Sequence, residues 1–436
     1  MNWGRLTWEL IRPYGRYVYY ELRPHRRPAY FHEPWKYPTH PVQAQKPGGR
    51  RPDPNRPTVI FFPMNDWHAR VQRSQQLAKA FAELGHRCIY VNPHLGLEYK
   101  APYAFDPRSM VSLLPGGIEE VHIHLPREHH CSSRFMTASE VRRVLDTVQT
   151  LLGDAEAPAI LIVSLPVWRE VAVALRAERG FPLLYDCHDL LEGFERMPKE
   201  LPAAEGELFR SADMVSFSSQ YLLDTMCRRM PSLKGKSTLI RNAVDPRDFQ
   251  VAPHESQHGG APVIGYVGAL DHWFDIESVA AAARAHADWK FELVGRVEDP
   301  RILALNALPN IHFAGEAPYS EVPRILAGWS AAMIPFLRTP LTMATNPIKL
   351  YEYLSAGLPV ASTRLPEVER FGDHVHVADS PREFADAVAL AVHGDGSRQA
   401  AARKQMVASE TWQHRASALL SVVAEVTPVS SVSSAL

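Results

Sequence analysis

The stretch TNPIKLYEYLSAGLPVAST, residues 345–363, places a helix directly before a buried strand. The ring of Pro347 presets its φ angle for a first helical turn, and Gly357 can adopt the left-handed conformation that ends a helix. The apolar run from Pro359 to Ser362 then predicts a buried strand. In a parallel sheet, such a helix presents its free N–H groups at the sheet's ligand-binding edge, where anions bind.

Two charged side chains lie one turn apart on this predicted helix. Lys349 provides a positive charge for a phosphate, and the carboxylate of Glu352 can accept two hydrogen bonds from a ribose diol. The same spacing is typical of an exposed i,i+3 ion pair, which stabilises a helix by only a few tenths of a kcal/mol. Spacing alone therefore leaves both interpretations open.

The whole stretch resembles the donor-binding segment of GT-B glycosyltransferases, particularly the family-4-like group that uses nucleotide sugars. The resemblance rests on Glu352 followed by the run Ala356-Gly357-Leu358-Pro359-Val360. It implies that Glu352 binds the nucleotide ribose. Many members have a second Glu eight positions earlier that contacts the donor sugar, and this chain has Ala344 there. We therefore expect backbone amides around Thr345 and Asn346 to make that contact.

The resemblance also implies the fold and its domains. We expect an α/β protein of the GT-B class, with two Rossmann-like, doubly wound domains facing a cleft and a C-terminal crossover helix. Short apolar runs alternate with helical patterns, which indicates parallel sheets. The predicted parts are an arm and linker (1–56), an acceptor domain (57–248), a nucleotide-sugar domain (249–404), a crossover helix (405–426) and a disordered tail (427–436). The crossover helix is expected to belong to a final helical stretch over about 398–425.

Length and composition agree with two globular domains. The chain has 436 residues, too many for one core, and its net charge of −1 gives no general attraction to nucleic acid. It contains no apolar run that predicts a membrane-spanning helix or a secretory signal. Its twenty histidines show no metal-ligand spacing, and its scattered cysteines indicate reduced thiols in a cytoplasmic protein.

Residues 1–56 differ from the rest of the chain. They contain eleven Lys and Arg against four acidic residues, interleaved with Trp and Tyr, and residues 41–57 are rich in Pro, Gly and Arg. This composition suits the headgroup region of an anionic membrane, so we expect residues 1–40 to hold the protein peripherally on the inner face of the cell membrane. The alternative is an arm whose aromatic side chains pack on the protein or on a partner subunit.

Two glycine-containing turns are predicted at the donor diphosphate. Gly268 follows the strand Val263–Val267, and Gly295 with Arg296 follows the next strand; glycine lets the backbone approach a phosphate closely. Related enzymes often have an Arg and a Lys after the first of these glycines. This chain lacks both there, so Lys349 and backbone amides are the predicted phosphate partners, with Arg296 as a further candidate. A simple tight turn at Gly268 and an exposed cation at Arg296 are the alternatives. In related enzymes, the segment at 315–319 cradles the nucleobase with backbone groups.

The segment Tyr185-Asp186-Cys187-His188-Asp189 closes a predicted strand of the first domain. Charged groups at the end of a buried strand need partners, so these residues are candidates for catalysis. His188 and Asp189 resemble the His-Asp of family-4-like enzymes, where the His hydrogen-bonds the donor sugar beside the reacting carbon. A structural cap of the next helix is the alternative. Asp186 and Asp189 also have the spacing of a metal-binding pair, but GT-B enzymes generally need no metal, so none is expected.

The loop after the first predicted strand is the candidate acceptor site. It contains Asp66, Trp67 and Arg70, and Arg73 follows one turn after Arg70, so the two arginines are predicted to share one face toward an anionic acceptor. Two solvated arginines are an equal alternative.

The resemblance implies transfer of a sugar, expected to be a hexose, from a nucleoside-diphosphate sugar to a glycan or lipid-linked acceptor in polysaccharide biosynthesis. Family-4-like members retain the anomeric configuration without an enzymic base. An inverting enzyme would need one, and Asp66, His68, Asp186 and Asp189 are available. Two other functions remain open: a non-catalytic nucleotide-sugar-binding subunit of a polysaccharide assembly complex, and a sugar-nucleotide epimerase.

Overall fold

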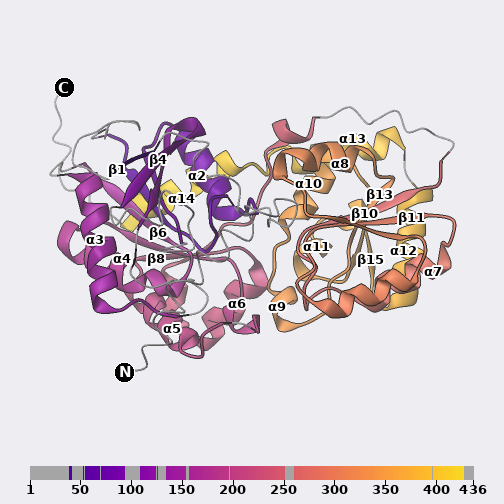
Figure 1. Cartoon of the computed structure of the whole chain (residues 1–436), viewed down its shortest axis with the longest axis horizontal. Coiled ribbons are helices and arrows are strands. Elements are labelled where there is room, and N and C mark those ends of the chain that lie inside the picture. Colours follow the sequence, from indigo (N-terminus) through magenta and orange to yellow (C-terminus); the bar gives the residue numbers. More distant parts are fainter. Residues whose placement is uncertain are drawn as a thin grey trace, which may run out of the picture. The chain divides into compact units, whose positions relative to one another are not determined.

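The structure is a computed structural model that divides into two compact units (Figure 1). The first unit comprises the described parts of Met1–Asp186, Glu195–Val215 and Leu420–Leu436, and the second comprises those of Cys187–Phe194 and Ser216–Leu419. The residues that the structure describes are 39–41, 53, 55–68, 70–93, 109–123, 125, 134–153, 157–195, 197–250, 260–394 and 396–426.

The first sheet has nine strands, and its central strands are parallel. β5, β3, β2, β6 and β7 pair in parallel, whereas β4 is antiparallel to β5 and β1 is antiparallel to β4. Along the sheet, the order is β1 (Thr39–Pro41), β4 (Met110–Leu114), β5 (Ile118–His122), β3 (Cys88–Val91), β2 (Thr58–Phe62), β6 (Ala159–Val163), β7 (Leu183–Cys187), β8 (Met214–Phe217) and β9 (Ser237–Leu239).

Helices connect these strands and begin where the sequence supplies caps. Thr137 accepts a hydrogen bond from the Glu140 amide at the start of α3, and Ser219 caps α6 through the Leu222 amide. The helices of this part of the chain are α2 (Arg73–Glu83), α3 (Ala138–Leu152), α4 (Arg169–Arg179), α5 (Leu201–Ser211) and α6 (Gln220–Arg229).

The second sheet has six parallel strands in the doubly wound order, as predicted. The order reverses between β10 and β13, and ligands of such sheets bind beyond the carboxyl ends of the strands at this reversal. Along the sheet, the order is β12 (Ile311–Gly315), β11 (Lys290–Val294), β10 (Val263–Val267), β13 (Ala331–Ile334), β14 (Val360–Thr363) and β15 (Val375–Ala378).

Helices cover both faces of the second sheet. Figure 1 shows α8, α10 and α13 on one face and α7 and α12 on the other, where α7 packs against α12. The buried apolar side chains between these layers form one continuous core. The helices are α7 (Ile276–Ala285), α8 (Val322–Ala327), α9 (Pro340–Met343), α10 (Ile348–Ala356), α11 (Pro366–Glu369), α12 (Pro381–His393), α13 (Ser397–Val407) and α14 (Trp412–Val426).

The C-terminal helical stretch is two helices, so the prediction of a single stretch over 398–425 was wrong. Between α13 and α14 the chain forms a β-bridge, in which Thr411 pairs with Val244 and the Val244 amide donates to the carbonyl of Glu410. α14 begins within the second unit, and from Leu420 onward it is grouped with the first. The last helix therefore contributes residues to both units, and its role as a crossover helix stays a prediction.

The strand β5 also differs from its prediction. The apolar residues at 121–125 predict a strand there, whereas β5 runs from Ile118 to His122, and the antiparallel strand β4 was not predicted. β5 contains two glutamates, which hide it from a search for apolar runs, yet all five of its residues are buried.

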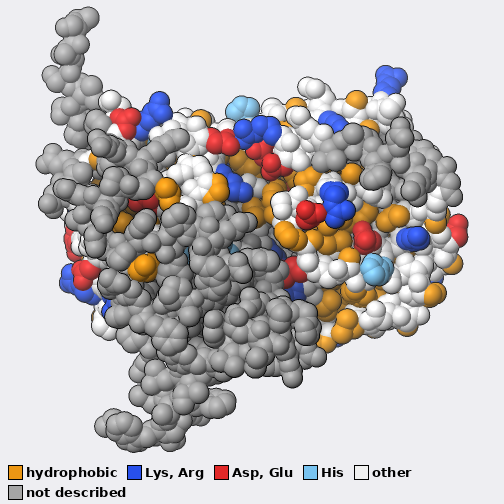
Figure 2. Space-filling view, turned by 45° about the horizontal axis from the view of Figure 1, so that its top comes forward, with side chains coloured by type: hydrophobic (Ala, Val, Ile, Leu, Met, Phe, Trp, Pro, Cys, Tyr) orange, Lys and Arg blue, Asp and Glu red, His pale blue; other side chains and the backbone are white. Residues whose placement is uncertain are grey.

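Among the described residues, no helix is long and apolar enough to cross a bilayer. On the face drawn in Figure 2, the described charged side chains of both signs are interspersed. The predicted membrane arm and the predicted C-terminal tail lie outside the described residues, apart from the backbone of β1, which pairs with β4.

Candidate active site

The turns after β10, β11 and β12 are joined by backbone hydrogen bonds. The Gly268 N–H donates to the carbonyl of Val294 at 2.9 Å, and the Gly295 N–H donates to the carbonyl of Gly315 at 2.7 Å. Gly295 has φ +152°, and a Cβ added there would lie 1.8 Å from the carbonyl oxygen of Gly268. Position 295 therefore has to be glycine for the two predicted diphosphate turns to meet.

Lys349 lies against the first of these turns. A Cβ added at Gly268 would be 3.1 Å from its Nζ. The ammonium group also lies 5.2 Å from the ring centroid of Tyr266 and 5.0 Å from that of Phe336, which stabilises it by cation–π attraction. Lys349 is in the first turn of α10, so its charge and the amides of the helix N-terminus act on the same side. This is an arrangement suited to a phosphate.

Glu352, one turn further along α10, is a buried carboxylate with raised pKa. Burial is the largest cause of the shift, and the pKa rises to about 7. A hydrogen bond from Tyr319 and the charge of Lys349 lower the pKa but do not outweigh burial, and Asp248 raises it further. A ligand that donates hydrogen bonds to the carboxylate would favour its ionised form.

The contact between Tyr319 and Glu352 joins two predicted subsites. Tyr319 ends the segment 315–319, for which the sequence predicted backbone contacts to a nucleobase, and Glu352 is the predicted ribose ligand. The sequence did not identify a side chain of this segment as part of the site. The available signal was the tyrosine at the end of this segment, because its hydroxyl group can donate a hydrogen bond.

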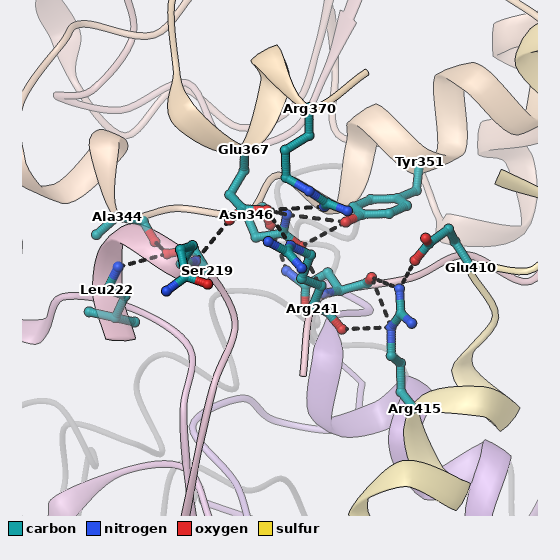
Figure 3. Close-up of polar contacts among 12 residues, drawn as sticks. Ser219, Leu222, Arg241, Ala344, Asn346, Tyr351, Glu367, Arg370, Glu410 and Arg415 are labelled. Atoms are coloured by element: carbon teal, nitrogen blue, oxygen red, sulfur yellow. Dashed lines mark hydrogen bonds and ion pairs between the residues drawn. The ribbon is translucent and has the colours of Figure 1, made fainter. Parts of the chain in front are cut away.

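Asn346 is part of a buried hydrogen-bond network (Figure 3). Its Oδ1 accepts from the Asn242 amide at 2.7 Å, and its backbone carbonyl accepts from Asn242 Nδ2 at 2.6 Å. Its Nδ2 donates to Glu367 at 3.1 Å and lies 3.2 Å from the Tyr351 hydroxyl. The amide side chain thus fixes the turn that precedes α10, while Thr345 donates its hydroxyl to the carbonyl of Leu341.

Glu367 lies at the centre of this network and was not predicted. It is 1% exposed, and it accepts hydrogen bonds from the Gln220 amide at 2.8 Å, from Arg241 at 2.8 Å and from Arg370 at 3.2 Å. Ser219 donates to the carbonyl of Ala344 at 2.6 Å on the neighbouring turn (Figure 3). These contacts hold the start of α10, and hence Lys349 and Glu352, against the rest of the second unit.

His188 follows β7 and belongs, with Asp189, to the second unit. The His188 side chain is 8% exposed, and its Nε2 lies 3.7 Å from Asp189 Oδ2, which is too long for a hydrogen bond. Its backbone carbonyl accepts a hydrogen bond from Ser218 at 2.7 Å. The structure therefore fixes the backbone of His188, and the sugar contact expected of its imidazole stays a prediction.

Asp186 and Arg73 pair with each other inside the first unit. The guanidinium donates to both carboxylate oxygens at 2.8 Å, and both side chains are almost completely buried. Such a bidentate pair satisfies both charges within the fold. Arg73 begins α2, whereas Arg70 precedes that helix, so the prediction that the two arginines share one helical face was wrong.

The remaining predicted residues lie on loops. Asp66 is buried and accepts a hydrogen bond from the His68 amide at 2.6 Å, and the Trp67 ring packs edge-on against Tyr90. Arg296 is half exposed and lies 3.3 Å from Glu298. Their roles toward acceptor and donor stay predictions.

Two family models match consecutive parts of the chain: residues 72–248 match Glycosyltransferase Family 4, and residues 276–421 match a model described as glycosyl transferase-like. Over these two parts, the chain is similar to family-4-like glycosyltransferases. The chain is 30% identical over 220 residues to the putative teichuronic acid biosynthesis glycosyltransferase TuaH of Bacillus subtilis strain 168, a match that covers 44% of this chain and 55% of TuaH. The chain thus matches about half the length of this relative.

Similarity to solved structures shows that the chain has the GT-B fold. Sucrose-phosphate synthase from Thermosynechococcus elongatus has a TM-score of 0.65 at 16% identity, covering 85% of this chain and 98% of that one. HepE of Anabaena, in complex with UDP and glucose, has a TM-score of 0.63 at 13% identity, covering 84% of this chain and 99% of that one. The predicted fold class is confirmed.

Proposed function

We propose that this glycosyltransferase moves a sugar from a nucleoside-diphosphate sugar to a glycan or lipid-linked acceptor during polysaccharide synthesis. The observation that carries the proposal is the grouping of Gly268, Lys349 and Glu352 at the carboxyl ends of the second sheet. Two similar proteins add support: TuaH is named for teichuronic acid biosynthesis, and HepE has been solved in complex with UDP-glucose.

Each group has a distinct task in this reaction. Lys349 and the amides after β10 stabilise the negative charge of the departing diphosphate, and Glu352 binds the ribose diol. The imidazole of His188 orients the sugar beside the reacting carbon. The resemblance to the family favours retention of configuration, assisted by the leaving phosphate and without a metal.

The decisive experiment measures release of nucleoside diphosphate from UDP-, GDP- and ADP-sugars. We expect slow release from one of them, and a loss of about 10²–10³-fold in turnover in Lys349→Met, the usual effect of removing one group that stabilises transition-state charge. Lys290→Met, at an exposed position on β11, is the matched control and should retain full turnover.

Other outcomes would identify the alternatives. Binding of a nucleotide sugar without any release, also in the presence of membrane extracts as acceptor source, would indicate a non-catalytic subunit. Interconversion of the free nucleotide sugar would indicate an epimerase. If a transferred product forms, its anomeric configuration by NMR should equal that of the donor, and inversion would contradict the retaining mechanism.

The composition of residues 1–40 also motivates a proposal of peripheral membrane attachment. Lys and Arg side chains near an anionic bilayer are attracted by about 1 kcal/mol each, and the attraction is screened by salt. Deletion of residues 1–40 should abolish salt-sensitive binding to vesicles containing anionic lipid and should leave nucleotide binding unchanged. Vesicle binding that survives the deletion, or that ignores salt, would contradict it.

A further inference from the structure

A second cluster of chemically capable side chains lies in the first unit, apart from the residues assigned above to the donor. His68 Nε2 lies 2.9 Å from Glu120 Oε2, and His122 Nε2 lies 3.1 Å from the same oxygen. The ligand atoms of all three residues lie within 4.8 Å of one another. Glu120 and His122 are buried, and the His68 side chain is only 9% exposed.

The fold brings these residues together from distant parts of the chain. Glu120 and His122 are two positions apart on β5, so their side chains point to the same face of the sheet. His68 comes from the loop after β2. Because β2, β3 and β5 are parallel, that loop and the carboxyl end of β5 lie at the same edge of the sheet.

The distances match those between ligands of a single metal ion. Zinc is bound by His nitrogen at 2.0–2.1 Å and by carboxylate oxygen at a similar distance in tetrahedral geometry, which places neighbouring ligand atoms about 3.3 Å apart. The two separations between the imidazoles and Glu120 are 2.9 and 3.1 Å. An ion could therefore replace the bridging protons with shifts of a few tenths of an ångström.

A buried amide orients the carboxylate, as outer partners do at metal centres. Asn92, which follows β3 and is completely buried, donates from Nδ2 to Glu120 Oε1 at 2.7 Å. This bond leaves Oε2 directed toward the two imidazoles. Ser112, opposite Glu120 on β4, places its Oγ 3.4 Å from His122 Nε2 and adds a further oxygen beside the cluster.

We propose that His68, Glu120 and His122 bind one divalent transition-metal ion, with Zn²⁺ as the best match to the donor set. Two imidazoles and one carboxylate form a known three-ligand set for zinc. The positive ion would compensate the buried carboxylate and attach the loop that carries Asp66 and Trp67 to β5. None of the three residues belongs to the proposed donor site, so the expectation that transfer itself needs no metal is unchanged.

The test is a metal titration of the full-length chain after treatment with a chelator. Co²⁺ should bind with a stoichiometry of one and give the visible absorption of a low-coordinate cobalt site, and Zn²⁺ should displace it. Asn92→Ala, which removes the outer partner, should weaken binding by about 10–100-fold, and His68→Asn should weaken it by more than that. His312→Asn, at an exposed position on β12, is the control and should bind like wild type.

His68 lies in a loop, so its replacement keeps the test valid even if His122→Asn fails to fold. Absence of stoichiometric Co²⁺ or Zn²⁺ binding by the full chain would overturn the proposal. Binding that is undiminished in a folded His68→Asn variant would also overturn it. Either result would leave a hydrogen-bonded His–Glu–His network. Neither result concerns nucleotide binding, so this outcome and that of the proposed function are independent.

Discussion

Glu120 in the first unit and Glu352 in the second are both buried carboxylates, but their surroundings change their acidity in opposite directions. At Glu120, burial raises the pKa, yet the charges and hydrogen bonds of His122 and His68 together outweigh it and hold the pKa well below its usual range. At Glu352, burial prevails over the hydrogen bond from Tyr319 and the charge of Lys349, and raises the pKa to about 7.

Without any bound ion, the Glu120 carboxylate is already compensated by side chains of the chain, whereas the Glu352 carboxylate has fewer partners. Asn92 and two imidazoles contact the Glu120 carboxylate, so its negative charge is compensated within the chain. Glu352 has a phenol and a more distant ammonium group, which leaves capacity for further donors such as a ribose diol. Opposite pKa shifts at similar burial thus distinguish a carboxylate that already has charged partners in the chain from one that can still accept hydrogen bonds from a ligand.

The largest expected effect is a loss of stability when the Glu120 carboxylate is removed. Glu120→Ala should lower the free energy of unfolding by about 3–5 kcal/mol, because it removes one partner of a buried charged cluster. Urea-induced unfolding measures the loss. Glu83→Ala, at an exposed position of α2, should stay within about 0.5 kcal/mol of wild type. A loss below about 1 kcal/mol in Glu120→Ala would show that the cluster is not compensated as inferred.

The next effect is the pH dependence of stability that follows from the raised pKa of Glu352. The pKa of Glu352 rises from 4.5 in the unfolded chain to about 7 in the native state. The native state therefore keeps a proton that the unfolded chain loses. The free energy of unfolding should fall by about 3 kcal/mol as the pH rises through this window in the absence of ligand.

Glu352→Gln isolates this contribution, because it keeps the shape of the side chain and removes the titration. The difference in stability between wild type and Glu352→Gln should change in favour of the variant between pH 4.5 and 8. A difference that stays constant over this range would mean that Glu352 titrates normally and is already compensated, like Glu120.

The third prediction concerns ligand binding at pH 8. Glu352→Ala should weaken the affinity for the best nucleotide by roughly 1.5–3 kcal/mol, about 10–150-fold in Kd, the usual value for hydrogen bonds to a charged group. Isothermal titration calorimetry measures it, with Glu277→Ala on α7 as the exposed control. An unchanged Kd in a folded variant would mean that Glu352 does not bind the nucleotide and forms only an i,i+3 ion pair with Lys349.

The smallest effect tests the partner that Glu352 already has. Tyr319→Phe removes one hydrogen bond, which is worth about 1 kcal/mol, so the pKa of Glu352 should rise further. Nucleotide affinity at pH 7 should fall roughly fivefold and recover as the pH rises. Tyr221→Phe on α6 is the control. A loss that is equal at all pH values would indicate that the Tyr319 hydroxyl contacts the nucleotide directly.

Local signals made the second unit predictable from the sequence. Gly357 has φ +84° and ends α10 as expected, and the strand β10 has its predicted bounds. Helix stops, apolar runs and glycine turns act within a few residues, so their consequences can be read in one segment. Lys349, Glu352 and Gly268 were found in this way, although their mutual distances came only from the structure.

The first unit depends on partners that lie far apart in the sequence. Arg73 and Asp186 pair across 113 positions, so each looked like a ligand-binding group on its own. The two glutamates in β5 concealed a buried strand, because two of the three side chains that contact the Glu120 carboxylate, Asn92 after β3 and His68 in the loop after β2, lie far away in the sequence. Pairing of this kind is tertiary, and no local pattern reports it.

The way the chain alternates between its two units has a consequence for dissecting the protein. The division falls after Asp186, after Phe194, after Val215 and within α14 after Leu419, so neither unit is one continuous segment. A fragment starting at Ser216 would lack His188, and a fragment ending at Val215 would lack the end of α14. Expression of either half alone therefore removes part of its own unit. A domain-swapped chimera with a relative would have to exchange all segments of one unit together.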